Sequence, residues 1–273
     1  MGAELSYAYA VLRPTAALDG DALGGVDGVA GGALRLVGTD DLAAAVSSVP
    51  EADFSEAALK RHLENLDWLE RVARAHDGVV AFLASYTTVL PLRLATVYVD
   101  DDRVRDVLHR GEAAFTRLLD RLADHVEWGV KIYAETTGGA SAGEGRGDVD
   151  AAAGASDPGR AYLRRRRQER EERGAARSAA AEAVRRIDVA AGAVALERAR
   201  HRPQQGQLAA GPGENVANDS YLVARERSEE FRERVRDAAD GLRGVRVEIT
   251  GPWAPYSFAA LPETGAPEEV RER

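Results

Sequence analysis

The chain has 273 residues, of which 45% are hydrophobic and 30% charged, a balance typical of globular proteins. Its length predicts two domains of about 100 to 150 residues each. The absence of cysteine excludes disulfides, thiolate nucleophiles and cysteine-ligated metal centres. The formal net charge of -9 argues against a chain-wide affinity for nucleic acid or anionic lipid. Because no apolar run approaches about 18 residues and the N-terminus lacks the pattern of a secretory signal, we expect neither a membrane span nor standard secretion.

The first half of the chain predicts a sheet covered by helices. Short apolar or alternating runs predict strands at 3–12, 33–37, 42–49, 79–83, 92–99 and 128–135. Leucines at helical spacing predict one helix over 53–76, ending at Gly78, and another over 101–125. Six glycines within 20–32 predict a loop. This order is typical of an α+β domain, here 1–136, in which two helices cover an antiparallel or mixed sheet.

The middle of the chain predicts a linker followed by a helix. Segment 137–158 is rich in glycine, has no hydrophobic period and predicts a flexible linker. The Ala-, Arg- and Glu-rich residues after it predict a long helix over 159–201, or a pair of helices broken around Gly192. Apolar residues three and four apart predict a packing seam on the second half of this helix: Ala180, Val184, Ile187, Ala191 and Val194.

The last part of the chain predicts a second small layer of sheet and helix. After a second flexible stretch at 203–214, the pattern predicts a strand, a helix and a half-buried strand at 218–225, 228–240 and 244–250. An aromatic block, Gly251 to Phe258, follows directly. We therefore expect a C-terminal domain over 159–258, which includes the long helix, and a mobile tail over 259–273.

No pattern in the sequence matches the residue spacings that catalysis requires. None of the five histidines stands at a metal-binding spacing with another histidine, Asp or Glu: His62, His76, His109, His125 and His201. No serine lies in a Gly-x-Ser-x-Gly elbow, and no glycine-rich segment has the pattern and context of a nucleotide-binding loop. We predict no catalytic, metal-binding or cofactor-binding residue.

The run Arg164 to Arg167 allows two interpretations. Four guanidinium groups would suit a phosphate backbone. Four consecutive helical residues, however, point in four directions, and acidic residues follow at once. We favour a solvated helix in which Arg165 lies one turn from Glu169, and Arg167 one turn from Glu171.

The aromatic cluster Trp253, Tyr256 and Phe258 also allows two interpretations. The neighbouring prolines impose an extended path, so the rings would fill a core or a domain seam, which is the interpretation we favour. The alternative is an aromatic anchor for a partner protein. If the Trp253 ring is core, its replacement by alanine would cost about 3–5 kcal/mol.

Short blocks spread along the chain together resemble the gas vesicle protein F/L family (GvpF/GvpL). In order, they are Leu5–Val11, Leu42–Pro50, Lys60–Leu63, Val89–Val97, Trp128–Lys131, Gly159–Leu163, Asn218–Val223 and Gly251–Phe258. The specific parts are the Leu-Pro-Leu-Arg sequence beginning at Leu90 and the terminal Gly-Pro-Trp-Ala-Pro-Tyr-Ser-Phe block. The chain departs from the family pattern mainly at 20–32 and 137–158, which resemble insertions.

The resemblance implies an α+β fold of two ferredoxin-like sheet-and-helix domains, joined through the flexible linker and the long helix. It also implies a non-enzymatic accessory protein of gas vesicle assembly, located in the cytoplasm and at the gas vesicle, without a cofactor. The implied partners are the small hydrophobic shell protein and other accessory proteins, with no nucleic acid and no membrane. Whether the chain is of the F type or the L type stays open. The residues expected to bind a partner are Trp253, Tyr256, Phe258, Leu90, Leu92 and Arg93.

Such a role is physically coherent, because the subunit of a gas-filled wall needs an apolar face and is prone to aggregate before it is incorporated. A soluble acidic protein with an exposed sheet edge or an apolar groove would cover that face. Two other classes stay open: a nucleic-acid-binding or regulatory protein that uses the helix at 160–200, and an enzyme with a deep pocket of titratable side chains.

Overall fold

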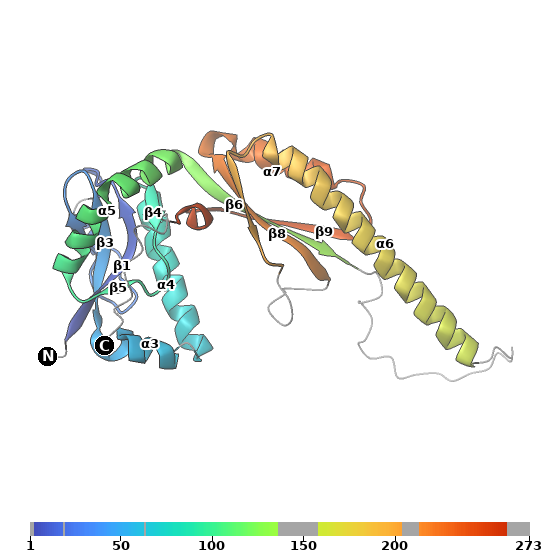
Figure 1. Cartoon of the computed structure of the whole chain (residues 1–273), viewed down its shortest axis with the longest axis horizontal. Coiled ribbons are helices and arrows are strands. Elements are labelled where there is room, and N and C mark those ends of the chain that lie inside the picture. Colours follow the sequence, from blue (N-terminus) through green and yellow to red (C-terminus); the bar gives the residue numbers. More distant parts are fainter. Residues whose placement is uncertain (1–2, 19, 63, 136–157, 204–212, 261–273) are drawn as a thin grey trace. The chain divides into compact units, whose positions relative to one another are not determined.

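The computed structural model describes residues 3–18, 20–62, 64–135, 158–203 and 213–260, without the side chains of 158–161. The predicted linker at 137–158, the second flexible stretch and the tail lie almost entirely outside these residues. The chain forms two compact units: unit 1 comprises 1–127 with 252–273, and unit 2 comprises 128–251 (Figure 1). Each contains an antiparallel sheet with helices, so the predicted mixture of helix and sheet is confirmed.

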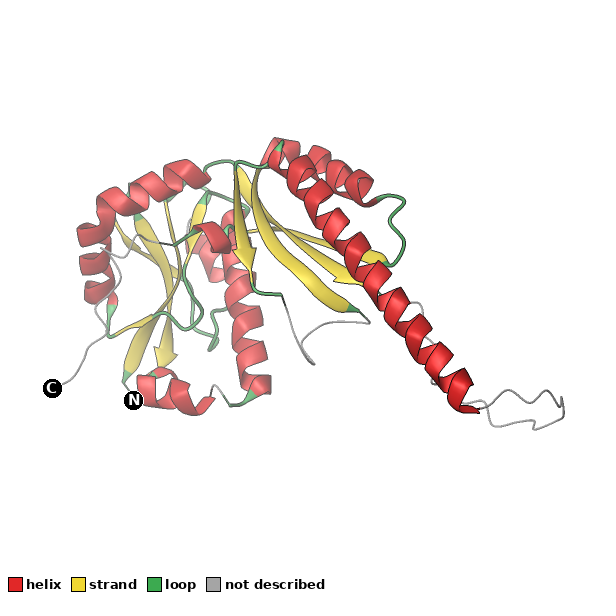
Figure 2. Ribbon diagram, turned by 45° about the vertical axis from the view of Figure 1, so that its right-hand side comes forward, coloured by secondary structure: helices red, strands yellow, loops and turns green. Residues whose placement is uncertain are grey.

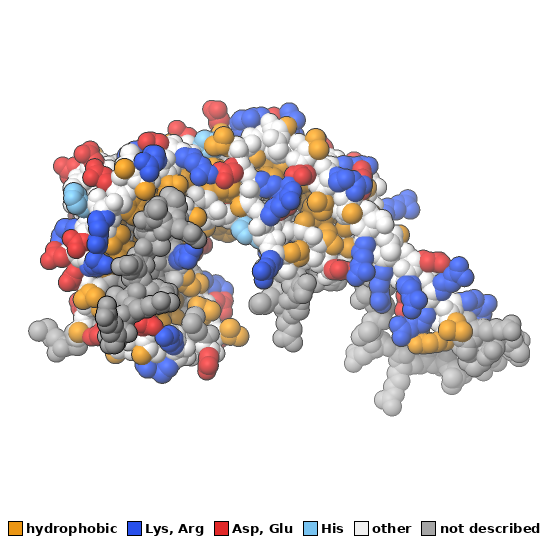
Figure 3. Space-filling view, viewed as in Figure 1, with side chains coloured by type: hydrophobic (Ala, Val, Ile, Leu, Met, Phe, Trp, Pro, Cys, Tyr) orange, Lys and Arg blue, Asp and Glu red, His pale blue; other side chains and the backbone are white. Residues whose placement is uncertain are grey.

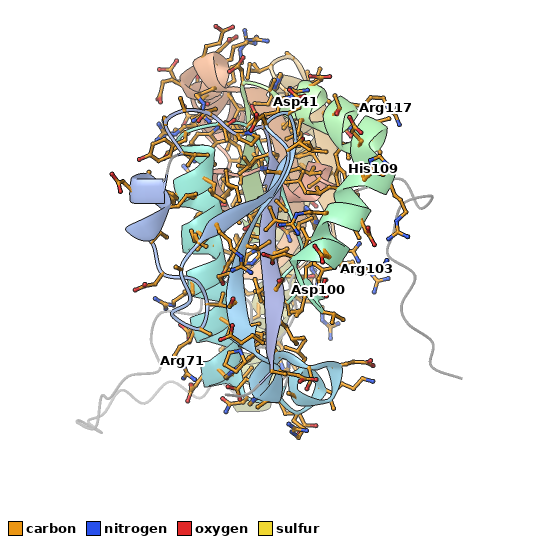
Figure 4. All side chains as sticks on the ribbon, turned by 90° about the vertical axis from the view of Figure 1, so that its left-hand side faces the viewer. Asp41, Arg71, Asp100, Arg103, His109 and Arg117 are labelled. Atoms are coloured by element: carbon orange, nitrogen blue, oxygen red, sulfur yellow. The ribbon has the colours of Figure 1, made fainter. Side chains whose placement is uncertain are left out.

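Unit 1 is a sheet with helices on both faces. Its strands are β1 (Glu4–Leu12), β2 (Arg35–Gly38), β3 (Ala43–Pro50), β4 (Val89–Pro91) and β5 (Val97–Tyr98). Its helices are α1 (Gly20–Gly24), α2 (Glu51–Phe54), α3 (Glu56–His62), α4 (Leu66–Ala84) and α5 (Asp101–Leu122). The sheet order is β2-β3-β1-β4, and β5 also pairs with β1. Every residue from Ser6 to Leu12 is buried, because α4 and α5 cover opposite faces of β1 (Figure 4).

Unit 2 is a four-stranded sheet covered by two helices that pack against each other. In chain order it contains β6 (His125–Ala134), α6 (Pro158–Gly192), β7 (Glu197–His201), β8 (Glu214–Ala224), α7 (Ser228–Ala239) and β9 (Val245–Trp253). Figure 2 shows both helices beside the sheet, whose order is β7-β8-β6-β9. The two sheets share one strand order. When the strands of each unit are numbered along the chain, the order across the sheet is second, third, first, fourth. Strand β6, assigned from sequence to the end of the first domain, pairs within the sheet of unit 2.

Capping side chains set the start of the two long helices of unit 1. The Asn65 side chain accepts a hydrogen bond from the backbone N–H of Trp68 at the start of α4. Asp100 does the same for Arg103 at the start of α5. At the turn between β2 and β3, Gly38 has a φ of 148° and a side chain there would clash with the Leu42 carbonyl, so glycine is required.

The structure corrects four predictions in the first half. Residues 79–83, predicted as a strand, form the last part of α4, because Val79, Val80 and Leu83 continue its buried stripe and Gly78 does not end the helix. The predicted helix over 53–76 is divided into α2, α3 and α4. The predicted loop at 20–32 contains the short helix α1, and the predicted strand at 92–99 is strand only at β5.

The long helix is also shorter than predicted. It ends at Gly192, and residues 197–201 form β7 instead of a helix. Strand pairing decides this outcome: β7 runs antiparallel to β8, with Arg198 opposite Tyr221. The predicted seam is confirmed in most of its positions, since Ala180, Ile187 and Ala191 are buried.

Candidate functional site

The most specific sequence block of unit 1 forms a rigid loop at the edge of the sheet. β1 pairs with β4 near Val11 and with β5 near Tyr7, and residues 92–96 bulge outward between these pairings. Two further backbone hydrogen bonds to β1 close the base of the loop: Leu92 N–H donates to the Tyr9 carbonyl at 2.8 Å, and Thr96 accepts from Ala8 at 2.9 Å. We call residues 92–96 the β4–β5 loop.

Inside the β4–β5 loop, Ala95 has a φ of 61°, in the left-handed region. Such a backbone costs about 1–3 kcal/mol and persists only where the surroundings enforce it. Here the backbone N–H of Ala95 donates to the buried hydroxyl of Tyr7 at 2.9 Å. The N–H and hydroxyl of Thr96 both donate to the Arg93 carbonyl, at 3.2 and 2.7 Å. The loop is therefore fixed before any partner binds.

An apolar cavity of about 200 Å³ lies between the β4–β5 loop and α5. Its lining comes from the sheet, the loop, α5 and the segment after the aromatic block: Val11, Ala44, Pro91, Leu92, Arg93, Thr96, Tyr98, Val104, Val107, Leu108, Phe115, Ala259 and Ala260. Arg93 is the one charged residue among them. One of the two specific sequence blocks thus lines the apolar cavity through Pro91, Leu92 and Arg93, and the two residues directly after the other block complete the lining.

A bidentate ion pair holds the first turn of α5 against the sheet. Arg35 on β2 donates to both carboxylate oxygens of Asp101, at 2.7 and 2.9 Å, and the Ser6 hydroxyl donates to the same carboxylate at 2.6 Å. The bonds from Arg35 lower the pKa of Asp101. This anchor fixes the helix that forms one wall of the apolar cavity.

A second, shallower pocket lies at α4, beside Leu94 in the middle of the β4–β5 loop. It is lined by Ala73, Arg74, His76, Asp77, Leu94 and Tyr256. His76 is buried, with Nδ1 3.0 Å from the Tyr7 hydroxyl and its ring beside that of Tyr256. Burial lowers the pKa of His76 and raises that of Tyr7. A neutral imidazole fits this environment, because the same Tyr7 hydroxyl that accepts from the β4–β5 loop can donate its hydrogen to Nδ1.

We expect the stability of unit 1 to fall on mild acidification because of His76. Its folded-state pKa lies below the unfolded value of about 6.5, so unfolding takes up a proton in this range. The stabilisation that neutral His76 gives the folded state is fully present above about pH 6.5 and is lost as the pH falls through the folded-state pKa of His76. Urea unfolding between about pH 7.5 and 5 should show a steeper loss for the unmodified chain than for His76→Gln. Equal slopes would contradict this assignment.

The expected site residues separate into buried and exposed groups. Leu90 and Phe258 are buried, Leu92 and Tyr256 are half-buried, and Arg93 and Trp253 are exposed. Trp253 is 48% exposed, so its ring does not fill a core; the domain seam, the other place expected for the rings, stays a prediction. Next to Phe258, Ser257 donates its N–H and hydroxyl to the buried carboxylate of Glu127, which fixes this segment to unit 1.

The Arg-rich stretch is a solvated helix. Nearly every side chain from 162 to 175 on α6 is exposed, and side chains of both charge signs lie along the helix, with Arg in the majority (Figure 3). Arg165 pairs with Glu169 at 3.3 Å and Arg167 with Glu171 at 2.9 Å, as predicted. These pairs partly neutralise the positive charge that the binding of a nucleic acid would require.

The sequence did not indicate the α5 wall of the apolar cavity. Val104, Leu108 and Phe115 belong to the predicted apolar face of this helix, but such a pattern does not distinguish a residue that faces a cavity from one that faces a packed sheet. His76 was expected at a helix end and lies in the core instead. In the described part of the chain, no helix is long and apolar enough to cross a membrane, and no cluster of three potential metal ligands occurs.

Comparison with known proteins gives a consistent result. Residues 5–260 match the family model for gas vesicle synthesis protein GvpL/GvpF. The chain is 45% identical over 268 residues to gas vesicle protein L of Streptomyces sp. (strain CB03234), covering 98% of this chain and 96% of the relative. It is 28% identical over 262 residues to gas vesicle protein F of the same strain, covering 93% and 98%.

Two crystal structures share the fold. Gas vesicle protein GvpF from Anabaena sp. PCC7120 superimposes with a TM-score of 0.61 at 15% identity, covering 95% of this chain and 97% of the other. GvpF from Microcystis aeruginosa gives a TM-score of 0.62 at 14% identity, covering 94% and 99%. With a fold, a whole-chain family match and a close relative in agreement, the chain belongs to the GvpL/GvpF family of gas vesicle synthesis proteins.

Proposed function

We propose that the protein is a non-enzymatic accessory factor of gas vesicle assembly, which acts in the cytoplasm and at the growing vesicle by binding the small hydrophobic shell protein. Family membership supports the role in assembly. The observation that carries the binding step is an apolar cavity beside a rigid loop, lined by Pro91, Leu92 and Arg93 of one specific sequence block and by the two residues that follow the other. That cavity offers apolar contact and a single charged residue, which suits the binding of an apolar group.

The physical reason for such a factor lies in the properties of its partner. A wall subunit with one apolar face exposes that face to water until it joins the vesicle, and exposed apolar surface drives aggregation. A binding protein that covers part of the face would keep the subunit assembly-competent. The expected partner-binding residues Leu92 and Arg93 line the apolar cavity, and Tyr256 lines the shallow pocket. Trp253 offers a further exposed aromatic contact in unit 1.

We also propose that both units are variants of a ferredoxin-like sheet-and-helix domain, and that the linker predicted at 137–158 joins β6 to α6 within unit 2. The order strand, helix, strand, strand, helix, strand in unit 2 supports this, as does the strand order that the two sheets share. The higher identity to the L protein than to the F protein of one strain supports an L-like role. Other accessory proteins of the vesicle are further expected partners.

The binding step is tested by copurification with the shell protein. We expect affinity-tagged protein, co-expressed with the shell protein, to recover it well above the level given by an unrelated acidic protein of similar size. Cells that lack the gene should form few or no vesicles under phase-contrast and electron microscopy. Equal recovery by the acidic control, together with normal flotation of the deletion strain, would contradict the proposed function.

A further inference from the structure

We propose that unit 1 recognises its partner through a two-part contact, in which an apolar side chain of the partner enters the apolar cavity and a neighbouring carboxylate pairs with Arg93. This inference rests on the proposed function for the partner's identity, a protein of the gas vesicle. It adds the chemistry of recognition: an aromatic or branched aliphatic residue with an Asp or Glu close to it in space.

The size and lining of the apolar cavity define the first part. An apolar cavity of about 150 Å³ in another protein is large enough to take up benzene, and this one measures about 200 Å³. It therefore accommodates one aromatic ring or one branched aliphatic side chain. Its lining is mostly apolar and includes Val104, Leu108 and Phe115, against which a polar side chain would lose hydration without gaining hydrogen bonds.

The charge of Arg93 defines the second part. Its side chain is exposed at the cavity, and within the described residues its guanidinium forms no ion pair or hydrogen bond. Three other arginines of unit 1 are paired: Arg13 with Asp120, Arg35 with Asp101, and Arg105 with Asp102. A carboxylate is the group that a planar guanidinium binds with two parallel hydrogen bonds. As the one charged residue in the cavity lining, Arg93 therefore favours an acidic residue beside the partner's apolar anchor.

The rigidity of the β4–β5 loop joins the two parts. Leu92, Arg93 and Thr96 come from one loop whose backbone is fixed to β1 and to the Tyr7 hydroxyl. Binding therefore costs little ordering of the loop, and the distance between the cavity and the charge is set before the encounter. Such a fixed spacing selects partners in which the apolar and acidic groups are matched.

The test uses the full chain and the co-expressed shell protein, with recovery and affinity measured for matched variants. Arg93→Glu and Val107→Trp, which fills the cavity from a half-buried position on α5, should each weaken binding about tenfold or more. Arg93→Lys should retain part of it. The control is Arg117→Glu, which makes the same charge change at an exposed position near the C-terminal end of α5 (Figure 4). Arg117 does not line the cavity, so this variant should bind as the unmodified chain does.

A charge-swap scan identifies the acidic residue of the partner. Single Asp or Glu to Arg substitutions in the shell protein are tested against Arg93→Glu, and we expect one of them to restore binding. Xenon under pressure should shift the methyl NMR signals of Val104 and Leu108 in the unmodified chain but not in Val107→Trp. Unshifted signals in the unmodified chain would mean that its own residues fill the cavity, which would overturn the proposal.

The outcomes separate the two levels of the argument. If the unmodified chain binds the shell protein and Arg93→Glu and Val107→Trp bind equally well, the two-part contact is wrong while the proposed function stands. If the unmodified chain does not bind the shell protein, both are wrong. Thermal unfolding of each variant identifies any that has lost its fold, and Arg93→Gln then serves as the milder substitution at that position.

Discussion

Replacing Phe258 with alanine is expected to lower the free energy of unfolding by about 3–5 kcal/mol, the usual cost of removing a buried aromatic ring. The Phe258 side chain is only 4% exposed, and its segment is fixed by the hydrogen bonds from Ser257 to Glu127. Trp253, five residues earlier, is 48% exposed. Trp253→Ala should therefore cost about 1 kcal/mol or less, because an exposed ring leaves no enclosed void.

Urea or thermal unfolding of the two variants, measured side by side, checks this contrast. The two substitutions remove aromatic rings from the same block, so a general effect of shortening aromatic side chains would lower both stabilities alike. A large loss for Trp253→Ala with a small loss for Phe258→Ala would reverse the assignment of core and surface. Binding of the shell protein by Trp253→Ala, measured under conditions in which this variant is fully folded, then shows whether the exposed ring contacts a partner.

The sequence predicts an element well wherever one face of that element is buried. The leucine stripe of α5 comes directly from the contrast between a buried and an exposed face. Prediction fails where the period is ambiguous. Residues 79–83 are a continuous apolar run, which fits a buried strand and a buried helix equally well, and only packing of α4 against β1 decides between them.

Long-range pairing explains the other failure, at the end of α6. The charged residues 197–201 have no strong preference for strand, yet they form β7 because β8 offers a complementary edge. That pairing joins residues about twenty positions apart and leaves no signal in either segment alone. The sequence therefore placed the end of the helix too late.

The candidate site was predicted only in part, for the same physical reason. Leu92 and Arg93 were singled out as members of a specific block, but the cavity beside them exists only because α5 packs across the sheet at this point. The positive φ of Ala95 and its bond to Tyr7 have no signature in a single sequence, since alanine rarely adopts this conformation. A pattern of residue types identifies what is unusual, and the fold determines what those residues enclose.

In unit 2, Arg198→Ala is expected to destabilise the fold by about 3–5 kcal/mol, because it leaves a buried acidic residue without its partner. Arg198 on β7 bonds to Asp188 on α6 and, at 2.8 Å, to Asp219 on β8, and its guanidinium lies over the Tyr221 ring. The side chains of Arg198 and Asp219 are only 18% and 8% exposed. Burial raises the pKa of the neighbouring Tyr221 hydroxyl to about 12, as expected for a poorly hydrated site.

Two further variants isolate the cause of this loss. Arg200→Ala is the matched control, because Arg200 is exposed, lies 3.9 Å from the same Asp188 and should contribute about 0.5 kcal/mol or less. The double variant Arg198→Met with Asp219→Asn removes the charged pair together and should recover much of the stability lost in Arg198→Ala, since no unpaired charge is left buried. Urea unfolding of the three variants measures the series. If Arg198→Ala costs no more than Arg200→Ala, the ion pair that joins α6, β7 and β8 does not hold unit 2 together, and the stability of the unit must come from its apolar seam alone.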